Sequence, residues 1–190
     1  MSESLVDEVV RQNLIYYRYV SMLVQGFAAD VKSMVDVGSG DRPLIEEFDW
    51  IPKRVCVDKK RIYQSENVKG ILVDFFDYEP EEKFDFGLCL QTLEHIPDAK
   101  KFTRKLFEIA NHVLISVPYK WKAGTVAGHI HDPVDLDKII EWAGRKPRYH
   151  IVVEEPFTGH KRLICYYPPR GEKVSVLEAR KKAMNYLKNK

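Results

Sequence analysis

The chain has 190 residues, with 30 Lys and Arg against 28 Asp and Glu, so its formal net charge is only +2. This length fits one domain with a sizeable core, and a composition of 45% hydrophobic and 31% charged residues excludes disorder or a fibrous repeat as the main organisation. The balanced charge gives no reason to expect a nucleic acid or an anionic membrane as a partner.

The beginning of the chain and the cysteines bear on the cellular compartment. The first ten residues, MSESLVDEVV, carry acids where a secretory signal has a basic region and an apolar core. No apolar run approaches the roughly 20 residues that span a bilayer. Cys56, Cys89 and Cys165 lie far apart in apolar stretches, which is typical of buried thiols rather than of disulfides or zinc ligands. We therefore expect a cytoplasmic protein without a membrane anchor.

Hydrophobic patterning predicts alternating helices and strands along the chain. Apolar residues at helical spacing predict helices over about 3–29, 98–111, 135–142 and 172–190. Short apolar runs predict strands at 33–37, 54–58, 70–74, 84–90, 112–117, 149–154 and 162–167. A capping acid and a proline, Asp41 and Pro43, predict a further helix start after the first strand.

The character of the strands predicts the fold class. The first four are nearly continuous Val, Ile, Leu and Phe, as in strands covered on both faces of a parallel sheet. We expect an α/β, doubly wound, Rossmann-like sheet of seven mostly parallel strands, with an antiparallel C-terminal hairpin and helices at both ends. The predicted organisation is a single domain over 1–190, with an N-terminal helical segment 1–30, a core 31–168 and a C-terminal helix 172–190.

A glycine loop followed by an acid predicts a ligand site at the carboxyl ends of the strands. Gly38-Ser39-Gly40 follows the first sheet strand, and glycine permits a tight turn and close approach of a ligand. Asp58 ends the next strand, where an acid can bind ribose hydroxyls. Asp36 suits a ligand with a cationic amino group, although it could also only brace the loop. The third glycine of a dinucleotide fingerprint is missing, and there is no P-loop.

The chain resembles the class I S-adenosylmethionine-dependent methyltransferases in these residues and in the run FDFGLCLQTLEHIP at 84–97. Within that class it is similar to the small-molecule branch, which is typified by ubiquinone and menaquinone biosynthesis methyltransferases. The resemblance covers about residues 33–118 and implies S-adenosylmethionine as cofactor, with Asp74 and Phe75 facing its adenine. The implied cofactor-binding residues are Asp36, Gly38, Ser39, Gly40, Asp58, Lys59, Asp74, Phe75, Leu90 and Gln91. The insertion that caps the substrate in larger relatives is missing, so residues 1–30 are expected to form a lid.

The loop after the fifth strand carries the candidate catalytic residues. A hydroxyl acceptor must lose its proton, and His129 or His131 would act as general base, oriented by Asp132 or Asp135. Three alternatives remain open: Asp132 caps the next helix, the histidines only bind backbone, or His129, His131 and Asp132 bind a divalent metal. We assign no metal. The candidate substrate contacts are Tyr17, His95, Tyr119 and Trp121.

The sequence thus predicts a methyltransferase that acts on a small polar molecule, by O-methylation of a sugar or similar metabolite. Nucleic acid is disfavoured, because Gln91-Thr-Leu-Glu94 stands where methyltransferases of base amines carry an Asn/Asp-Pro-Pro-aromatic run. The alternatives are an RNA or protein methyltransferase recruited by the basic C-terminal segment, and a non-catalytic cofactor-binding subunit. A homodimer is left open.

Overall fold

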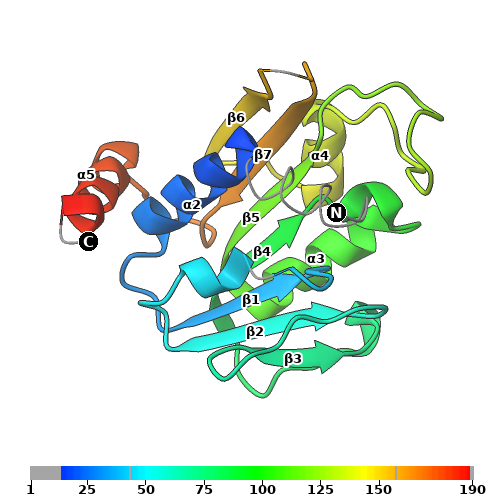
Figure 1. Cartoon of the computed structure of the whole chain (residues 1–190). Helices are drawn as coiled ribbons and strands as arrows, with labels where there is room; N and C mark the ends of the chain where they lie inside the picture. The colour runs from blue at the N-terminus through cyan, green and yellow to red at the C-terminus, as the bar shows by residue number, and fades with distance from the viewer. Residues whose placement is uncertain (1–13, 43, 157, 189–190) are drawn as a thin grey trace, which may run out of the picture.

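The structure, a computed structural model, describes residues 14–42, 44–156 and 158–188. Its centre is one seven-stranded sheet with the order β3-β2-β1-β4-β5-β7-β6 (Figure 1). The strands are β1 (Ser33–Val37), β2 (Lys53–Asp58), β3 (Lys69–Leu72), β4 (Phe84–Leu90), β5 (Ala110–Pro118), β6 (Tyr149–Glu154) and β7 (Lys161–Tyr167). β1 to β5 are parallel, whereas β7 pairs antiparallel with both β5 and β6. The predicted Rossmann-like fold with its antiparallel hairpin is confirmed.

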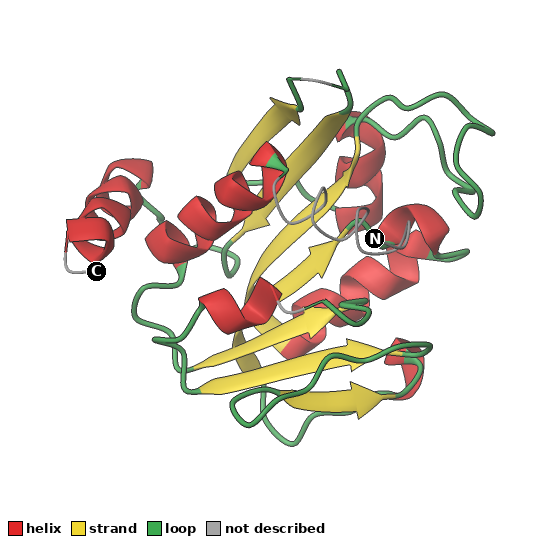
Figure 2. Ribbon diagram, in the orientation of Figure 1, coloured by secondary structure: helices red, strands yellow, loops and turns green. Residues whose placement is uncertain are grey.

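Helices cover both faces of this sheet (Figure 2). They are α2 (Ile15–Phe27), α3 (Ala99–Ile109), α4 (Leu136–Ala143) and α5 (Val176–Lys188). All four match predicted helices, with α4 ending one residue later than expected, although residues 1–13 of the first prediction lie outside the described residues. None of the helices described combines the length and the apolar character that a membrane crossing needs.

The predicted helix after β1 is replaced by a short 3-10 helix, Leu44–Glu47. The acid expected to cap a helix, Asp41, instead forms an ion pair with Arg61 at 3.2 Å. Pro52 then limits the connection, because the residue before a proline avoids the helical region and β2 begins directly after it, at Lys53. The described part of the crossover from β1 to β2 therefore carries one turn of 3-10 helix in place of a full helix.

Alternation along the strands divides the core into two layers. Successive side chains point to opposite faces of a sheet, so Val35 and Val37 pack with the α3–α4 layer, whereas Met34 packs with the α2 layer. Cys56, Cys89 and Cys165 are buried and free, as predicted. α5 packs mainly against α2, where a Cβ added to Gly26 would meet the Ala179 carbonyl oxygen at 2.9 Å.

A carboxylate from the β6–β7 hairpin holds the first turn of α2. Leu14, at the N-cap position, makes no side-chain capping bond. Instead Glu155 accepts hydrogen bonds from the backbone N–H groups of Ile15 (2.9 Å) and Tyr16 (3.0 Å), and it pairs with Arg162 at 3.5 Å. A negative charge at a helix N-terminus satisfies free donors and favours the helix dipole. The start of α2 is thereby fixed to the β6–β7 hairpin, 140 positions later in the chain.

Glu155→Gln is expected to lower the free energy of unfolding by about 1–3 kcal/mol, because it removes a buried, charge-assisted acceptor while keeping its shape. Urea denaturation measures the change. The matched control is Glu154→Gln, which removes an exposed ion pair with Lys161 and should change stability by less than about 1 kcal/mol. Equal effects of the two variants would contradict a special role for Glu155.

Candidate functional site

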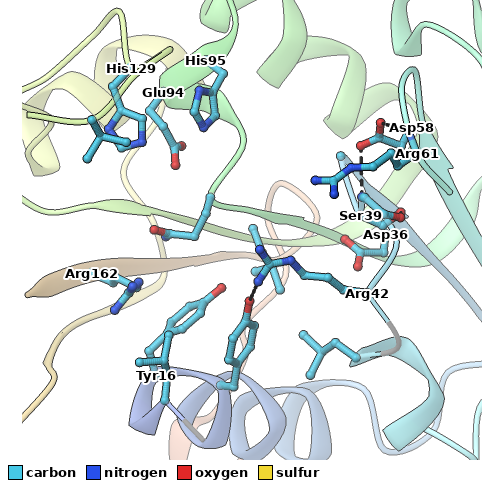
Figure 3. A pocket seen from close by; sticks show the side chains of 18 of the residues that line it. Tyr16, Asp36, Ser39, Arg42, Asp58, Arg61, Glu94, His95, His129 and Arg162 are labelled. Carbon is cyan, nitrogen blue, oxygen red and sulfur yellow. Dashed lines mark hydrogen bonds between the residues drawn. The ribbon is translucent and has the colours of Figure 1, made fainter. Parts of the chain in front are cut away.

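A cavity of about 430 Å³ opens at the carboxyl ends of β1, β2 and β4, between the sheet, α2 and the loop after β5 (Figure 3). Its volume lies in the range of small-molecule sites, and its position is where ligands bind in open α/β sheets. Seven of the ten predicted cofactor residues line it. They are Asp36, Gly38, Ser39, Gly40, Asp58, Leu90 and Gln91.

The two glycines of the loop meet different requirements. Gly38 has a φ of 75°, and a Cβ there would lie 2.4 Å from Cγ2 of Thr92, so this residue packs tightly against the loop after β4. Gly40 has a φ of 59°, but its Cβ position has no atom within 4 Å among the residues described. The first glycine allows close packing, whereas the second leaves open space on the cavity wall.

Asp58 orders the loops on both sides of the cavity entrance. One carboxylate oxygen accepts a hydrogen bond from the backbone N–H of Gly40 at 3.0 Å. The other accepts from the N–H groups of Lys60 (2.8 Å) and Arg61 (3.2 Å). Asp58 lines the cavity, as expected for a ribose-binding acid, and it also holds the glycine loop in place before any ligand arrives.

Asp36 is a buried carboxylate with an unused acceptor. Its exposed fraction is 4%, and its Oδ1 has no hydrogen-bond partner in the described part of the chain. Burial, together with the charge of Asp58, raises the pKa of Asp36 to about 7. Such a group favours a cationic hydrogen-bond donor in the cavity, because a cation would restore both its charge balance and its missing bond.

Three predicted cofactor residues do not line the cavity. Asp74 caps the short 3-10 helix Phe75–Asp77 by accepting from the N–H of Phe76, and it pairs with Lys59 at 3.5 Å. The ring of Phe75 points into the core, with its centroid 4.5 Å from that of Phe102. This local turn points Phe75 away from the cavity, a geometry that strand and motif spacing do not reveal.

The loop after β5 places only one of its two predicted histidines at the cavity. His129 lines it, and its Nδ1 lies 2.7 Å from the Asp132 carboxylate, with side-chain exposures of 5% and 1%. His131 instead bonds the Ile96 carbonyl oxygen through Nε2 at 2.8 Å. Asp135, not Asp132, caps α4. Of the predicted residues, the structure brings together His129 and Asp132 as a pair. Within the residues that the structure describes, the His129 ring is hydrogen-bonded at Nδ1 and not at Nε2.

Two further groups meet His129 at the same end of the cavity (Figure 3). Glu94 and His95 follow β4 in a 3-10 helix, and ligand atoms of Glu94, His95 and His129 lie within 4.8 Å of one another. Glu94 is 1% exposed, and burial raises its pKa to about 8. The trio proposed from the sequence as a metal alternative does not converge, because Nε2 of His131 is bound elsewhere.

A further part of the cavity wall is aromatic and cationic, and it adjoins His129, whose ring stacks on Trp121 with centroids 5.8 Å apart. Tyr17 and Trp121, both predicted substrate contacts, line the cavity together with Tyr16 and Arg162. The Arg162 guanidinium lies over the rings of Tyr16 (5.1 Å) and Trp121 (5.6 Å). Tyr119 does not line the cavity. The sequence gives one signal for Arg162, a charge at the head of an apolar strand.

The comparisons with known proteins concern the fold. No family model and no curated protein sequence matches the chain. Among solved structures, it is similar to N-methyltransferase NodS from Bradyrhizobium japonicum WM9, with a TM-score of 0.62 and 12% identity over 80% of this chain and 95% of that one. An S-adenosylmethionine-dependent methyltransferase from Clostridium acetobutylicum ATCC 824 gives 0.60 and 11%, over 87% and 97%. The chain has the Rossmann-like methyltransferase fold.

This fold does not by itself determine the reaction. The [4+2]-cyclase SpnF is also similar, with a TM-score of 0.58 and 11% identity over 82% of each chain. NodS has been crystallised with S-adenosyl-L-homocysteine. At such low identities the function of this chain has to be argued from its own side chains.

Proposed function

We propose that the chain is an S-adenosylmethionine-dependent methyltransferase that methylates an oxygen of a small polar molecule, such as a sugar. The observation that carries the proposal is the arrangement of Asp36, the glycine loop and Asp58 around one cavity. The unpartnered carboxylate of Asp36 fits the cationic amino group of the cofactor, and Asp58 fits its ribose. The open space at Gly40 leaves room for close approach of the ligand.

The remaining cavity wall fits a small polar acceptor. The cofactor supplies an electrophilic methyl group on a sulfonium, so the protein has to align an acceptor oxygen with it. Tyr17 and Trp121 offer aromatic ring surfaces at the cavity, which suit packing against a sugar ring. Because Tyr16 and Tyr17 belong to α2, this helix supports the proposed role of residues 1–30 as a lid.

Loss of the acceptor proton is assigned to His129. The bond from Nδ1 to Asp132 fixes the orientation of the ring and presents Nε2 to the cavity. This supports the sequence-based proposal of a histidine base with an orienting acid, with His129 rather than His131 in that role. A cytoplasmic location and the option of a homodimer remain sequence-based expectations.

Binding of S-adenosylhomocysteine tests the cofactor. Calorimetry and thermal denaturation should show binding by the wild-type chain, with about 2.7 kcal/mol of added stability at a ligand concentration of 100 Kd. Asp36→Asn should weaken binding about 10- to 100-fold at pH 8, because it removes a charge-assisted hydrogen bond. Absence of binding by the wild-type chain would refute the proposal.

The same variant should become more stable without ligand. The pKa of Asp36 is about 7 when folded and 3.8 ordinarily, so between these values the folded chain holds a proton that the unfolded chain has lost. Stability therefore falls as the pH rises through this window, and Asp36→Asn removes the fall. Urea denaturation should show the variant to be more stable than wild type at pH 8, with little difference at pH 4, which serves as the internal control.

A further inference from the structure

We propose that Glu94, His95 and His129 bind a divalent transition-metal ion at the acceptor end of the cavity. Their ligand atoms lie within 4.8 Å of one another, on two loops that follow neighbouring strands (Figure 3). The rings of His95 and His129 meet edge to face, with centroids 4.7 Å apart. Around a four-coordinate ion with bonds of about 2.0 Å the ligand atoms lie roughly 3.3 Å apart, so the site contracts on binding. His95 is exposed and is the ligand freest to move.

The hydrogen bonds behind the two histidines favour metal binding. Nδ1 of His129 bonds the carboxylate of Asp132 at 2.7 Å, and Nδ1 of His95 bonds the carbonyl oxygen of Gly128 at 2.9 Å. A carbonyl accepts only from a protonated nitrogen, so Nε2 of His95 carries the free electron pair. Carboxylates and carbonyls in these positions are the usual second layer of metal sites, because they fix the tautomer and strengthen the ligand.

Glu94 supplies an independent indication. Its side chain is almost fully buried, and Oε2 has no hydrogen-bond partner among the residues that the structure describes. A buried carboxylate without a partner is costly, and an ion at the ligand cluster would compensate it. Glu94 thus provides a buried acceptor that a cation bound between it and the two histidines would satisfy.

The donor set indicates the class of ion. Two imidazole nitrogens and one carboxylate suit Zn²⁺, Co²⁺, Mn²⁺ or Fe²⁺, whereas Mg²⁺ and Ca²⁺ prefer oxygen ligands. Three protein ligands leave a coordination position open, as in catalytic rather than structural sites. Because all three residues line the cavity, an ion held by them would be accessible to the proposed acceptor.

The catalytic role of the ion rests on the proposed function, whereas binding of the ion can be tested without it. An acceptor hydroxyl bound to the ion would lose its proton to solvent more easily. Its oxygen would then form the bond to the methyl carbon as the carbon–sulfur bond breaks, releasing the neutral thioether. His129 would act here as a ligand rather than as the proton acceptor, since Nε2 cannot do both.

The test is metal binding by the full chain, which needs no acceptor. After treatment with a chelator and its removal, Zn²⁺ titration by calorimetry should show one ion per chain, and Co²⁺ should give the visible absorption of a nitrogen- and oxygen-bound ion. Glu94→Gln and His129→Gln should weaken Zn²⁺ binding at least tenfold. Asp132→Asn, which keeps all three ligands, should weaken it about 10- to 100-fold. His150→Gln, on an exposed part of β6, is the matched control and should bind as wild type.

Two results would overturn the site. The first is the absence of stoichiometric Zn²⁺ binding by the wild-type chain. The second is equal Zn²⁺ affinity of the wild-type chain and Glu94→Gln, when circular dichroism shows that both are folded. Binding of S-adenosylhomocysteine, measured on the same samples with and without chelator, separates this outcome from failure of the methyltransferase proposal. Retained cofactor binding without metal binding would leave His129 as a general base. Loss of both would remove the two proposals together.

Discussion

His129→Gln is expected to lower the rate of methyl transfer by about 10²–10⁴-fold, the range for loss of a group that assists proton removal. Binding of S-adenosylhomocysteine should stay unchanged, because the glycine loop and Asp58 lie at the other end of the cavity (Figure 3). The effect is expected whether Nε2 binds the proposed ion or takes the proton directly. A radiolabelled methyl-transfer assay against a panel of sugars and hydroxylated metabolites measures it.

His131→Gln is the matched control for this experiment. His131 belongs to the same loop, but its Nε2 bonds the carbonyl oxygen of Ile96, and its ring packs edge to face on Trp142 at 5.0 Å. The His131→Gln variant should have a lower free energy of unfolding than wild type, but its folded molecules should transfer the methyl group at the wild-type rate. A similar rate loss in both variants would show that the loop conformation, rather than the His129 nitrogen, carries the effect.

Gly38→Ala should destabilise the chain by about 2–5 kcal/mol and abolish cofactor binding at ambient temperature. The new methyl group would meet Thr92 at 2.4 Å, well inside contact distance, in a backbone region that alanine avoids. Gly40→Ala is the comparison, since only its backbone conformation is unfavourable, and it should cost about 1–2 kcal/mol. Thermal denaturation with and without S-adenosylhomocysteine distinguishes the two.

A double variant isolates the steric part of that cost. Thr92→Ala removes both atoms that approach closest to the added Cβ, so Gly38→Ala with Thr92→Ala should lose less stability than the sum of the single changes. If the stability losses of the two single variants were additive in the double variant, we would conclude that the whole effect of Gly38→Ala comes from backbone strain.

The sequence predicts the sheet well because buried strands consist of consecutive hydrophobic residues, which can be recognised directly in the sequence. Continuous apolar runs indicated the parallel strands, and the Gly159 break indicated the hairpin that now pairs as β6 and β7. The position of the glycine loop at the cavity is predictable in the same way, because the motif consists of residues only a few positions apart.

The rest of the site depends on contacts between distant segments. Tyr16 lies at the start of a helix and Arg162 at the head of a strand, and only the folded chain brings both to one wall. Likewise, His129 and His131 are indistinguishable by spacing, and it is the position of Ile96 that binds one of them away from the cavity. Phe75 turns inward for a comparable reason, since Phe102 offers it a core partner.

The attachment of α2 to Glu155 also constrains the order in which the molecule can be completed during synthesis. The two bonded segments are separated by 140 positions, so the turn that carries Tyr16 gains its cap only after β6 has left the ribosome. A nascent chain that ends at β5 already contains the glycine loop and Asp58 but lacks this support. The half of the cavity formed by the glycine loop and Asp58 can thus assemble early from near neighbours, whereas closure of the wall that carries Tyr16 waits for one of the last contacts to form.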